Sequence, residues 1–435
     1  MRTPVHHADA LECRASVQTG PTAELLLAIA ASGLPGSMLR SPQRPLDDAS
    51  WRSLLPRVDE HRLTGLLLKA LASQVFPATA EQALQAQRLH AQAISRVLLR
   101  DAALLEAAET LDRAGIVWRA LKGAATAHLV YADPAARPYR DVSVLVPTAR
   151  FDDALQALSV LGYERRSPPL KPRFDVTFGN AVSIARADGI SIDLRRTLSP
   201  GPFGLTVELD PLFQTAAVFS LGGRPIKALA PEAHFLHSCY ETALGDLSSR
   251  LVSLRDVAQQ ALGDELNVER VFTLASAWAG EAVLAVAIRL AWERFALADV
   301  VPLSAWARRY TPSRRERRFL LGYQTRRFTH EALDSLQVIK GVGSKAAFLS
   351  AVALPDPVWL AHHDQRRGRW LRRGATTVLR RPRGSTVTGA EEVGRARAPS
   401  ILTIRPYTAR RLPQFSTASQ SSLGPRTTAL IEERS

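Results

Sequence analysis

Within the segment from Arg137 to Val146, the sequence predicts a strand that begins with the carboxylate of Asp141 and carries the hydroxyl of Ser143 two residues later. Because side chains alternate between the two faces of a strand, Asp141 and Ser143 project from one face, and the valines beside them are buried on the other. Two oxygen-bearing side chains at this spacing, beside a third acid on a neighbouring strand, could hold a divalent cation against a triphosphate. The second position ideally holds another acid, so Ser143 decides how much of such a site remains.

A further acid, Asp193, occupies the middle of a strand predicted from Ile190 to Leu194. An acid at such a position is unfavourable unless it meets water, a cation or a partner. Asp141 and Asp193 on neighbouring strands could therefore share a Mg²⁺ ion. The alternative is that each acid pairs with a nearby arginine, and the candidates are Arg137, Arg140, Arg195 and Arg196.

Lys122 and Gly123 stand between a predicted strand, Ile116 to Leu121, and a predicted helix, Ala124 to Tyr131. A helix N-terminus has exposed N–H groups that suit a phosphate, and glycine allows the backbone to approach a ligand closely. Strand–glycine–helix turns are also common for structural reasons. The dipeptide alone therefore does not identify a site.

The rest of the chain alternates between helical and strand-like patterns. Apolar residues at helical spacing predict helices over residues 21–31, 51–71, 79–111, 147–162, 233–244, 247–262, 268–279 and 282–297. Strand-like runs cover residues 174–178, 181–185 and 190–194, and Asp188-Gly189 predicts a hairpin turn between the last two. Together these patterns indicate an α+β protein with a small mixed sheet flanked by helical segments.

We expect five parts along the chain. They are a disordered leader (1–20), an N-terminal helical segment (21–112), the sheet-containing core (113–228), a helical domain (229–375) and a basic, disordered tail (376–435).

Composition excludes several classes of protein. The 435 residues include only two cysteines, Cys13 and Cys239, which offer no disulfide framework and no zinc-type spacing and fit a reducing cytoplasm. The N-terminus lacks the apolar stretch of a signal peptide. The most apolar helix, Ala282 to Leu297, contains three charged residues, so we expect a cytoplasmic protein without a membrane span.

The net charge of +15 raises the question of a polyanionic partner. Many arginines gather between residues 366 and 383, across the start of the predicted tail. Few aromatic residues interleave with them, which favours a solvated face or a disordered tail over a nucleic-acid-binding surface.

Taken together, these motifs resemble the nucleotidyltransferase superfamily, and in particular a bacterial family of largely uncharacterised nucleotidyltransferase-like proteins. The matching residues are Leu121-Lys122-Gly123, Arg137-Pro138, Asp141, Leu145-Val146, Leu161-Gly162-Tyr163 and Asp193. The helical segment with His234, His237 and Arg255-Asp256 also resembles the second half of that family.

The resemblance implies a nucleotidyltransferase-fold core that transfers a nucleotidyl or phosphoryl group from Mg-NTP to an unidentified acceptor hydroxyl. It implies that Asp141 and Asp193 are catalytic and that they bind one or two Mg²⁺ ions together with Ser143. Lys122, Gly123, Arg137 and Ser143 would bind the nucleotide. Residues 231–354 would help to shape the acceptor site.

The sequence departs from the family pattern at two places. Ser143 replaces the second acid, and an arginine, Arg195 or Arg196, stands where the family has a histidine after the third acid. A serine removes one negative charge, although its hydroxyl can still ligate Mg²⁺. One ion could therefore be retained, while a two-ion site is in doubt.

Two alternatives follow from these departures. The chain could be a degenerate member of the fold, a pseudoenzyme that binds a nucleotide or a protein without turnover. It could instead be a nucleic-acid-associated protein that uses its basic C-terminal region for polyanion contact.

Other candidate groups predict structure more than chemistry. His234 and His237 are three residues apart on a helix, and without a third ligand we expect them to be packing residues. Arg255 and Asp256 are expected to form an intrahelical or interdomain ion pair.

Overall fold

The computed structural model describes residues 20–245, 250–325 and 328–363. The predicted leader, except for its last residue, and the whole predicted tail lie outside the described residues. Within the described ranges, no helix is both long and apolar enough to cross a membrane.

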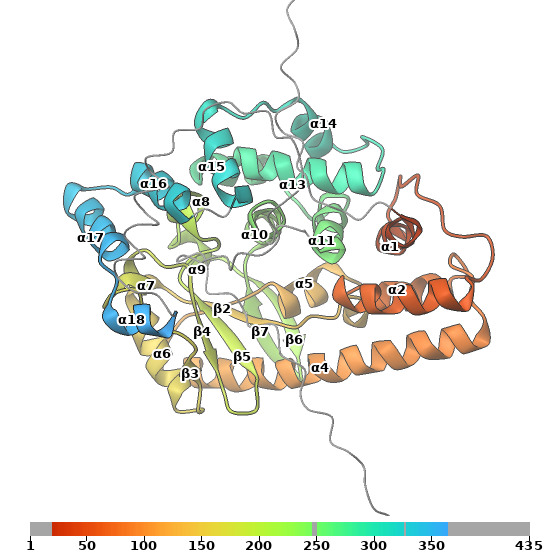
Figure 1. Cartoon of the computed structure of the whole chain (residues 1–435), viewed down its shortest axis with the longest axis horizontal. Helices are drawn as coiled ribbons and strands as arrows, with labels where there is room; N and C mark the ends of the chain where they lie inside the picture. The colour runs from red at the N-terminus through yellow and green to blue at the C-terminus, as the bar shows by residue number, and fades with distance from the viewer. Residues whose placement is uncertain (1–19, 246–249, 326–327, 364–435) are drawn as a thin grey trace, which may run out of the picture. The chain divides into compact units, whose positions relative to one another are not determined.

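Seven strands form one mixed sheet with the order β3-β4-β5-β2-β1-β7-β6 (Figure 1). The strands are β1 (Arg119–Leu121), β2 (Val142–Leu145), β3 (Glu164–Arg165), β4 (Ala181–Ala185), β5 (Ser191–Arg195), β6 (Ala217–Leu221) and β7 (Arg224–Ala228). β2 is parallel to β5 and β1 is parallel to β7, whereas the other neighbouring pairs are antiparallel. The prediction of an α+β protein with a mixed sheet is confirmed.

Helices make up most of the remaining structure. Before and within the sheet region they are α1 (Pro21–Ala31), α2 (Asp48–Glu60), α3 (Thr64–Ala72), α4 (Ala80–Arg113), α5 (Gly123–Val130), α6 (Phe151–Ser159), α7 (Phe174–Thr177), α8 (Gly201–Leu205) and α9 (Pro211–Gln214). After the sheet they are α10 (Pro231–Leu244), α11 (Leu251–Ala261), α12 (Val268–Ala277), α13 (Glu281–Arg294), α14 (Pro302–Arg309), α15 (Arg314–Thr325), α16 (Phe328–Val338), α17 (Val342–Ala353) and α18 (Pro357–His362). Two short 3₁₀ turns are Pro134–Ala136 and Thr148–Arg150.

Local residues explain two helix boundaries, one predicted and one not. α4 begins where the pattern predicts because Thr79 and Gln82 form a reciprocal capping box, each side chain accepting a hydrogen bond from the other residue's backbone N–H. The single helix predicted over 51–71 is divided into α2 and α3. Arg62 lies in the link between them with a left-handed backbone (φ 60°) that cannot continue a right-handed helix.

The strand predicted over Phe174 to Phe178 is wrong, because this segment forms the short helix α7. Its two phenylalanines lie one helical turn apart, with ring centroids 5.6 Å from each other, and both pack on Phe348. Residues four apart share a face in a helix and in a strand alike, so this spacing did not distinguish the two structures. The hairpin of β6 and β7 was not predicted at all.

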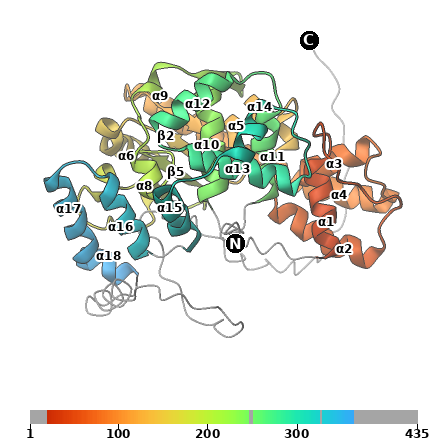
Figure 2. The same cartoon turned by 90° about the horizontal axis from the view of Figure 1, so that it is seen from above.

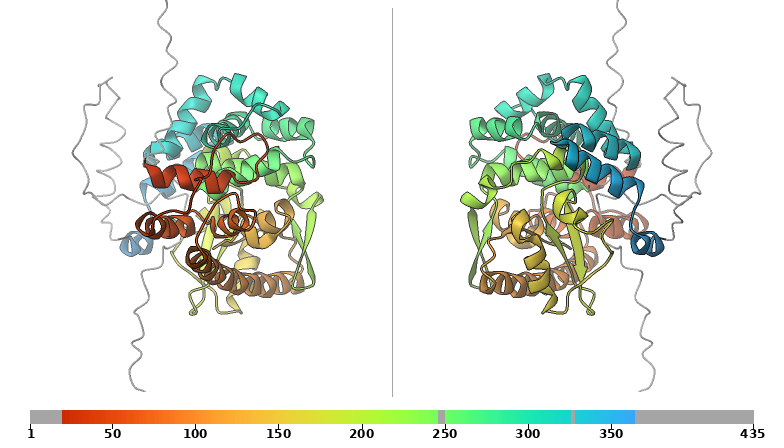
Figure 3. Two further views of the ribbon diagram at one scale, coloured as in Figure 1. Left: turned by 90° about the vertical axis from the view of Figure 1, so that its right-hand side faces the viewer. Right: turned by 90° about the vertical axis from the view of Figure 1, so that its left-hand side faces the viewer.

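The two faces of the sheet are buried in different cores (Figure 3). On one face Val144, Ile192 and Leu194 pack with residues of α4 and α6. On the other face Leu121 and Leu145 join a core formed with α10, α11 and α13. Since Ser143 and Asp193 alternate with the first set, they lie on the face toward α10.

The helices before and after the sheet share this second core. Leu26 and Ile29 of α1 and Leu66 of α3 belong to the same cluster as Leu254 of α11, and Figure 2 shows α1 close to α11. A smaller core joins α7 to α16, α17 and α18. Segments far apart in the sequence therefore enclose the same face of the sheet.

Candidate active site

The strands that carry the two predicted acids are neighbours in the sheet. β2 pairs with β5 so that Ser143 stands opposite Asp193, and β4 pairs with β5 so that Ser183 stands opposite Asp193 on the other side. Register partners project from the same face, so these three side chains form a polar row across three strands. Ser143 is only 2% exposed, and its hydroxyl has no hydrogen-bond partner among the described residues.

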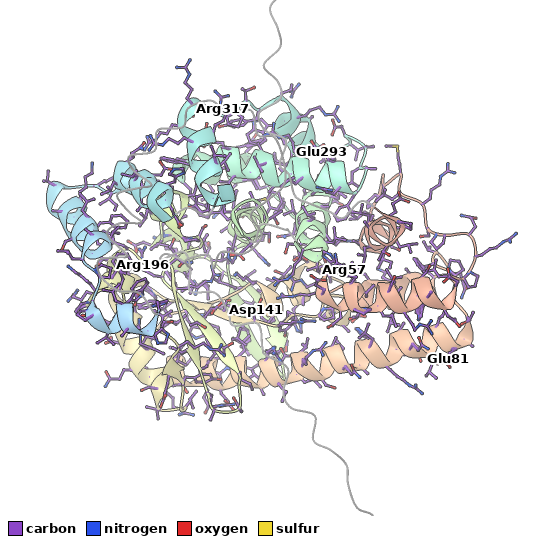
Figure 4. The ribbon with its side chains drawn as sticks, viewed as in Figure 1. Arg57, Glu81, Asp141, Arg196, Glu293 and Arg317 are labelled. Carbon is purple, nitrogen blue, oxygen red and sulfur yellow. The ribbon has the colours of Figure 1, made fainter. Side chains whose placement is uncertain are left out.

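Asp141 immediately precedes β2 and lies near the centre of the view in Figure 4. Its partner is Arg62, whose Nη2 donates to Oδ2 at 3.0 Å. Burial works against ionisation, but the positive charges of Arg62 and Lys122 outweigh it and hold the pKa of Asp141 well below its usual range. Asp141 is therefore a carboxylate at neutral pH. Its ion pair involves none of the four arginines that the sequence suggested.

Asp193 lies on the same face but in a different electrostatic setting. It is partly exposed, and within the part of the chain that the structure describes it forms no ion pair, because Arg195 pairs with Glu241. Burial raises the pKa of Asp193, although the charges of Arg195 and Lys122 oppose that shift. The negative charge of Asp141 adds to the rise in the pKa. The predicted alternative, a nearby arginine paired with each acid, is thus wrong for Asp193.

Lys122 lies between β1 and α5 in a backbone conformation that is unusual for a residue with a side chain (φ 52°, ψ −132°). Such conformations cost about 1–3 kcal/mol and persist only where the surrounding structure enforces them. Its Nζ lies 2.7 Å from Oε2 of Glu241 on α10. The strained turn therefore directs a cation toward the face that carries Asp141 and Asp193. The charge of Lys122 acts to lower the pKa of both carboxyls, although burial leaves the pKa of Asp193 raised overall.

Glu241 is a site residue that the sequence analysis missed. Besides Lys122, it contacts Arg195 Nη1 at 3.4 Å and His237 Nε2 at 3.7 Å. Burial opposes its charge, yet Lys122 and Arg195 hold the pKa of Glu241 well below its usual range. The available signal was an acid one turn after His237 in a largely apolar helix, but that spacing does not show what the acid contacts.

Gly123 has a structural role that the sequence does not reveal. A Cβ atom at this position would lie 2.8 Å from Cδ2 of Tyr139 and 3.0 Å from the carbonyl oxygen of Asp141. Only glycine therefore lets the start of α5 pack against the segment that leads into β2. This contact fixes Lys122 next to Asp141, whether or not the backbone of Gly123 also approaches a phosphate.

Arg137, which we expect to bind the nucleotide, forms an ion pair within the protein. Its guanidinium is buried and pairs with Asp256 of α11, with Nη2 at 2.5 Å from Oδ2. The hydroxyl of Tyr131 also donates to Asp256, at 2.8 Å. The structure thus pairs the charge of Arg137 with Asp256, and a contact of Arg137 with a phosphate stays a prediction. The expected pair of Arg255 and Asp256 is wrong, because Arg255 donates to backbone carbonyls of α1 and its C-cap and to Gln259.

A model of the family described as uncharacterised nucleotidyltransferase matches residues 47–296, more than half of the chain. The chain belongs to this family. No curated protein matches it. Two solved structures are similar at low overall agreement. The antibiotic-resistance factor ANT(2'')-Ia has 16% identity and a TM-score of 0.29, covering 42% of this chain and 92% of its own. An antigenic nucleotidyltransferase-like protein from Paracoccidioides brasiliensis has 21% identity and a TM-score of 0.28, covering 47% and 96%.

In this member of the nucleotidyltransferase family, the side chains of the two arginines after Asp193 point to different parts of the protein. Arg195 faces Glu241 and therefore stands on the site, where the resemblance implies a histidine. Arg196 donates from Nε to the carbonyl oxygen of Gly179 at 2.7 Å, which places it toward α7. Arg195 thus places a positive charge on the site.

The two histidines of α10 are buried, as predicted for packing residues. His234 shares a hydrogen bond with Thr126 of α5 at 3.0 Å, and burial lowers its pKa to about 3. Burial also lowers the pKa of His237, against the pull of Glu241. Both imidazoles are therefore neutral at physiological pH, and His237 adds no positive charge to the site.

The oxygen atoms of the site suit one divalent cation better than two. Asp141, Ser143 and Asp193 provide two carboxylates and a hydroxyl on one face. No group of three or more His, Cys, Asp and Glu side chains within the described ranges could hold a metal ion. The unpartnered hydroxyl of Ser143, buried beside Asp193, is an oxygen that a metal ion would satisfy. A two-ion site would need the third carboxylate that Ser143 replaces.

Proposed function

We propose that this protein binds a nucleoside triphosphate with one Mg²⁺ ion and transfers its nucleotidyl group to an acceptor hydroxyl. The observation that carries this proposal is the polar row of Ser143 and Asp193 in register, with Asp141 two residues before Ser143 on the same face. Family membership supports the reaction class. Asp141, Ser143 and Asp193 would hold the ion, which would supply charge neutralisation at the phosphates.

The cations around this row support a polyphosphate ligand. Lys122 and Arg62 both act on Asp141, and Lys122 and Arg195 both act on Asp193. Preorganised positive groups of this kind stabilise the charge that develops during phosphoryl chemistry. Lys122 and the turn at Gly123 would therefore seat the phosphates, whereas Arg137 would position α11 through Asp256.

The transfer step balances without a further reactant. The acceptor oxygen would form a bond to the α-phosphorus while the bond to the bridging oxygen breaks, and pyrophosphate leaves. Asp193, which is partly exposed on this face, would accept the proton of the acceptor hydroxyl. Asp141, held ionised by its neighbours, would keep the charge needed for the metal ion.

Isothermal titration of ATP and GTP, with and without Mg²⁺, tests this proposal. We expect Mg²⁺-dependent binding by the native protein and its loss in Asp141→Ala. The matched control is Asp153→Ala, which removes an exposed carboxylate paired with Arg150 on the surface of α6. Failure of the native protein to bind either nucleotide would overturn the proposal, as would equal loss of binding in both variants.

A second candidate, nucleotide binding without turnover, is favoured by Ser143 in place of an acid. It predicts that Ser143→Asp creates or strongly raises Mg²⁺-dependent activity, whereas brisk turnover by the native protein would exclude it. Nucleic-acid association through the basic C-terminal region stays a prediction, because that region lies outside the described residues. Polyanion binding that persists after truncation at Gly374 would contradict it.

A further inference from the structure

We propose that Arg62 is a phosphate-binding residue whose guanidinium moves from Asp141 to the phosphates of the nucleotide when a metal ion binds. Metal and nucleotide would then each strengthen the binding of the other. This inference rests on the proposed function and adds to it a residue from the N-terminal helical segment, which lies outside the motifs of the sheet.

Arg62 is held in place by a strained and buried link. It is 9% exposed and has a φ of 60°, and its neighbours Leu63 and Thr64 are almost completely buried. A positive φ in a residue with a side chain persists only where packing enforces it. Lys122 shares this feature at φ 52°. Two strained cationic residues from distant parts of the chain therefore act on the same carboxylate, Asp141.

The cations of the site differ in which anionic partner they would keep if a metal ion bound Asp141 and Asp193. Lys122 and Arg195 both contact Glu241 and would keep that anionic partner. Arg62 pairs with no acid other than Asp141 among the described residues, and its Nε is buried without a hydrogen-bond partner. A buried guanidinium that loses its counter-ion is strongly unfavourable. Of these three cations, Arg62 is the one that would therefore need a new anion.

A metal ion at Asp141 would compete for the oxygen atoms that Arg62 now contacts. Without nucleotide, the ion would leave Arg62 buried and unpaired, so metal binding alone would be weak. Phosphate oxygens match the planar fork of a guanidinium and would supply the missing anion. The two ligands would then bind with positive coupling, and this coupling must be reciprocal.

The test compares two binding constants of the native protein and Arg62→Gln by isothermal titration. They are the Kd of Mn²⁺ alone and the Kd of ATP in saturating Mn²⁺. We expect Arg62→Gln to bind Mn²⁺ alone about tenfold more tightly and ATP about tenfold more weakly, a coupling of ordinary size. The matched control is Arg140→Gln, which removes the same charge one residue before Asp141. The Arg140 guanidinium pairs with Asp59 at 2.5 Å and is exposed, so both constants should change by less than about twofold.

The opposite signs separate this role from simpler ones. If Arg62 had a purely structural role, Arg62→Gln would bind both Mn²⁺ and ATP more weakly. If Arg62 only competed with the metal ion, the variant would bind Mn²⁺ more tightly and ATP as well as the native protein does. Either result would overturn the proposal. If Arg62→Gln does not fold, Arg62→Lys should show both shifts in the same directions at about threefold, since it keeps the charge and loses the fork.

The two proposals fail in different ways. If the native protein does not bind ATP in the presence of Mn²⁺, both are overturned. If the native protein binds ATP and Asp141→Ala abolishes that binding, while Arg62→Gln changes neither constant, only the role of Arg62 is overturned.

Discussion

The two faces of the central strands follow the same backbone and yet have opposite properties. On the face toward α4, Val144 and Leu194 are completely buried among apolar side chains. One residue earlier on each strand, Ser143 and Asp193 place polar atoms on the face toward α10. The comparison teaches that one face stabilises the sheet through apolar burial, while the other retains groups that are costly to bury and so depend on charged neighbours or a ligand.

The largest effect is expected when an acid is placed on the apolar face. Val144→Asp would bury a carboxylate among apolar side chains, and we expect a loss of about 4 kcal/mol or more in the free energy of unfolding, or no folding at all. Urea denaturation followed by circular dichroism measures it. The paired variant Ser143→Asp should fold, and Mg²⁺ should stabilise it more than the native protein, because a ligand that binds only the folded state raises its stability. If Val144→Asp and Ser143→Asp lowered the free energy of unfolding equally, the difference between the two faces would be contradicted.

A smaller effect is expected at Asp141. Asp141→Asn breaks a charge-assisted hydrogen bond to the buried Arg62 and should cost about 2 kcal/mol at neutral pH. Because the folded pKa lies below the unfolded value of 3.8, the carboxylate stabilises the protein above that value. This stability disappears as the pH falls through the folded pKa. Urea midpoints of native protein and variant should therefore converge in strong acid, and a gap that stayed constant from pH 7 to pH 2 would contradict the pairing.

Asp193 should show the opposite dependence on pH. Its folded pKa is raised, so the carboxyl contributes stability that is fully present below the unfolded value of 3.8 and is lost as the pH rises through the folded pKa. Asp193→Asn removes this dependence. Relative to the native protein, the variant should gain stability between acid and neutral pH, although it should lose nucleotide transfer. Thermal melting across that range measures the difference, and a relative loss of stability with rising pH would show that Asp193 is paired.

The smallest effect on stability is expected at Lys122. Lys122→Gly relieves the positive φ but removes the ion pair with Glu241, so the free energy of unfolding should change by less than about 1 kcal/mol. ATP binding should nevertheless fall clearly, because a phosphate-facing cation is lost. Lys122→Ala separates the two contributions, since it removes the cation and keeps the strain. If both variants bind ATP like the native protein, Lys122 does not contact phosphate.

The sequence by itself determined the features that depend on local pattern. Alternation along 141–146 and 190–194 identified the strands of the two acids and their shared face, and apolar spacing located the start of α4, which Thr79 caps in the structure. These signals work because side-chain direction and helix capping depend on residues only a few positions apart. Where two periods coincide, as over Phe174 to Phe178, local pattern chose the wrong structure.

Only the tertiary structure decided which charges meet. Arg62 is 79 residues from Asp141, Glu241 contacts a lysine from the turn after β1, and Arg137 pairs with Asp256, which is 119 residues away. The sequence named nearby arginines as partners because separation along the chain was the only distance that it offered. Ion pairs between distant segments follow from how α3, α10 and α11 pack over the sheet, and that packing depends on apolar burial summed over the whole core.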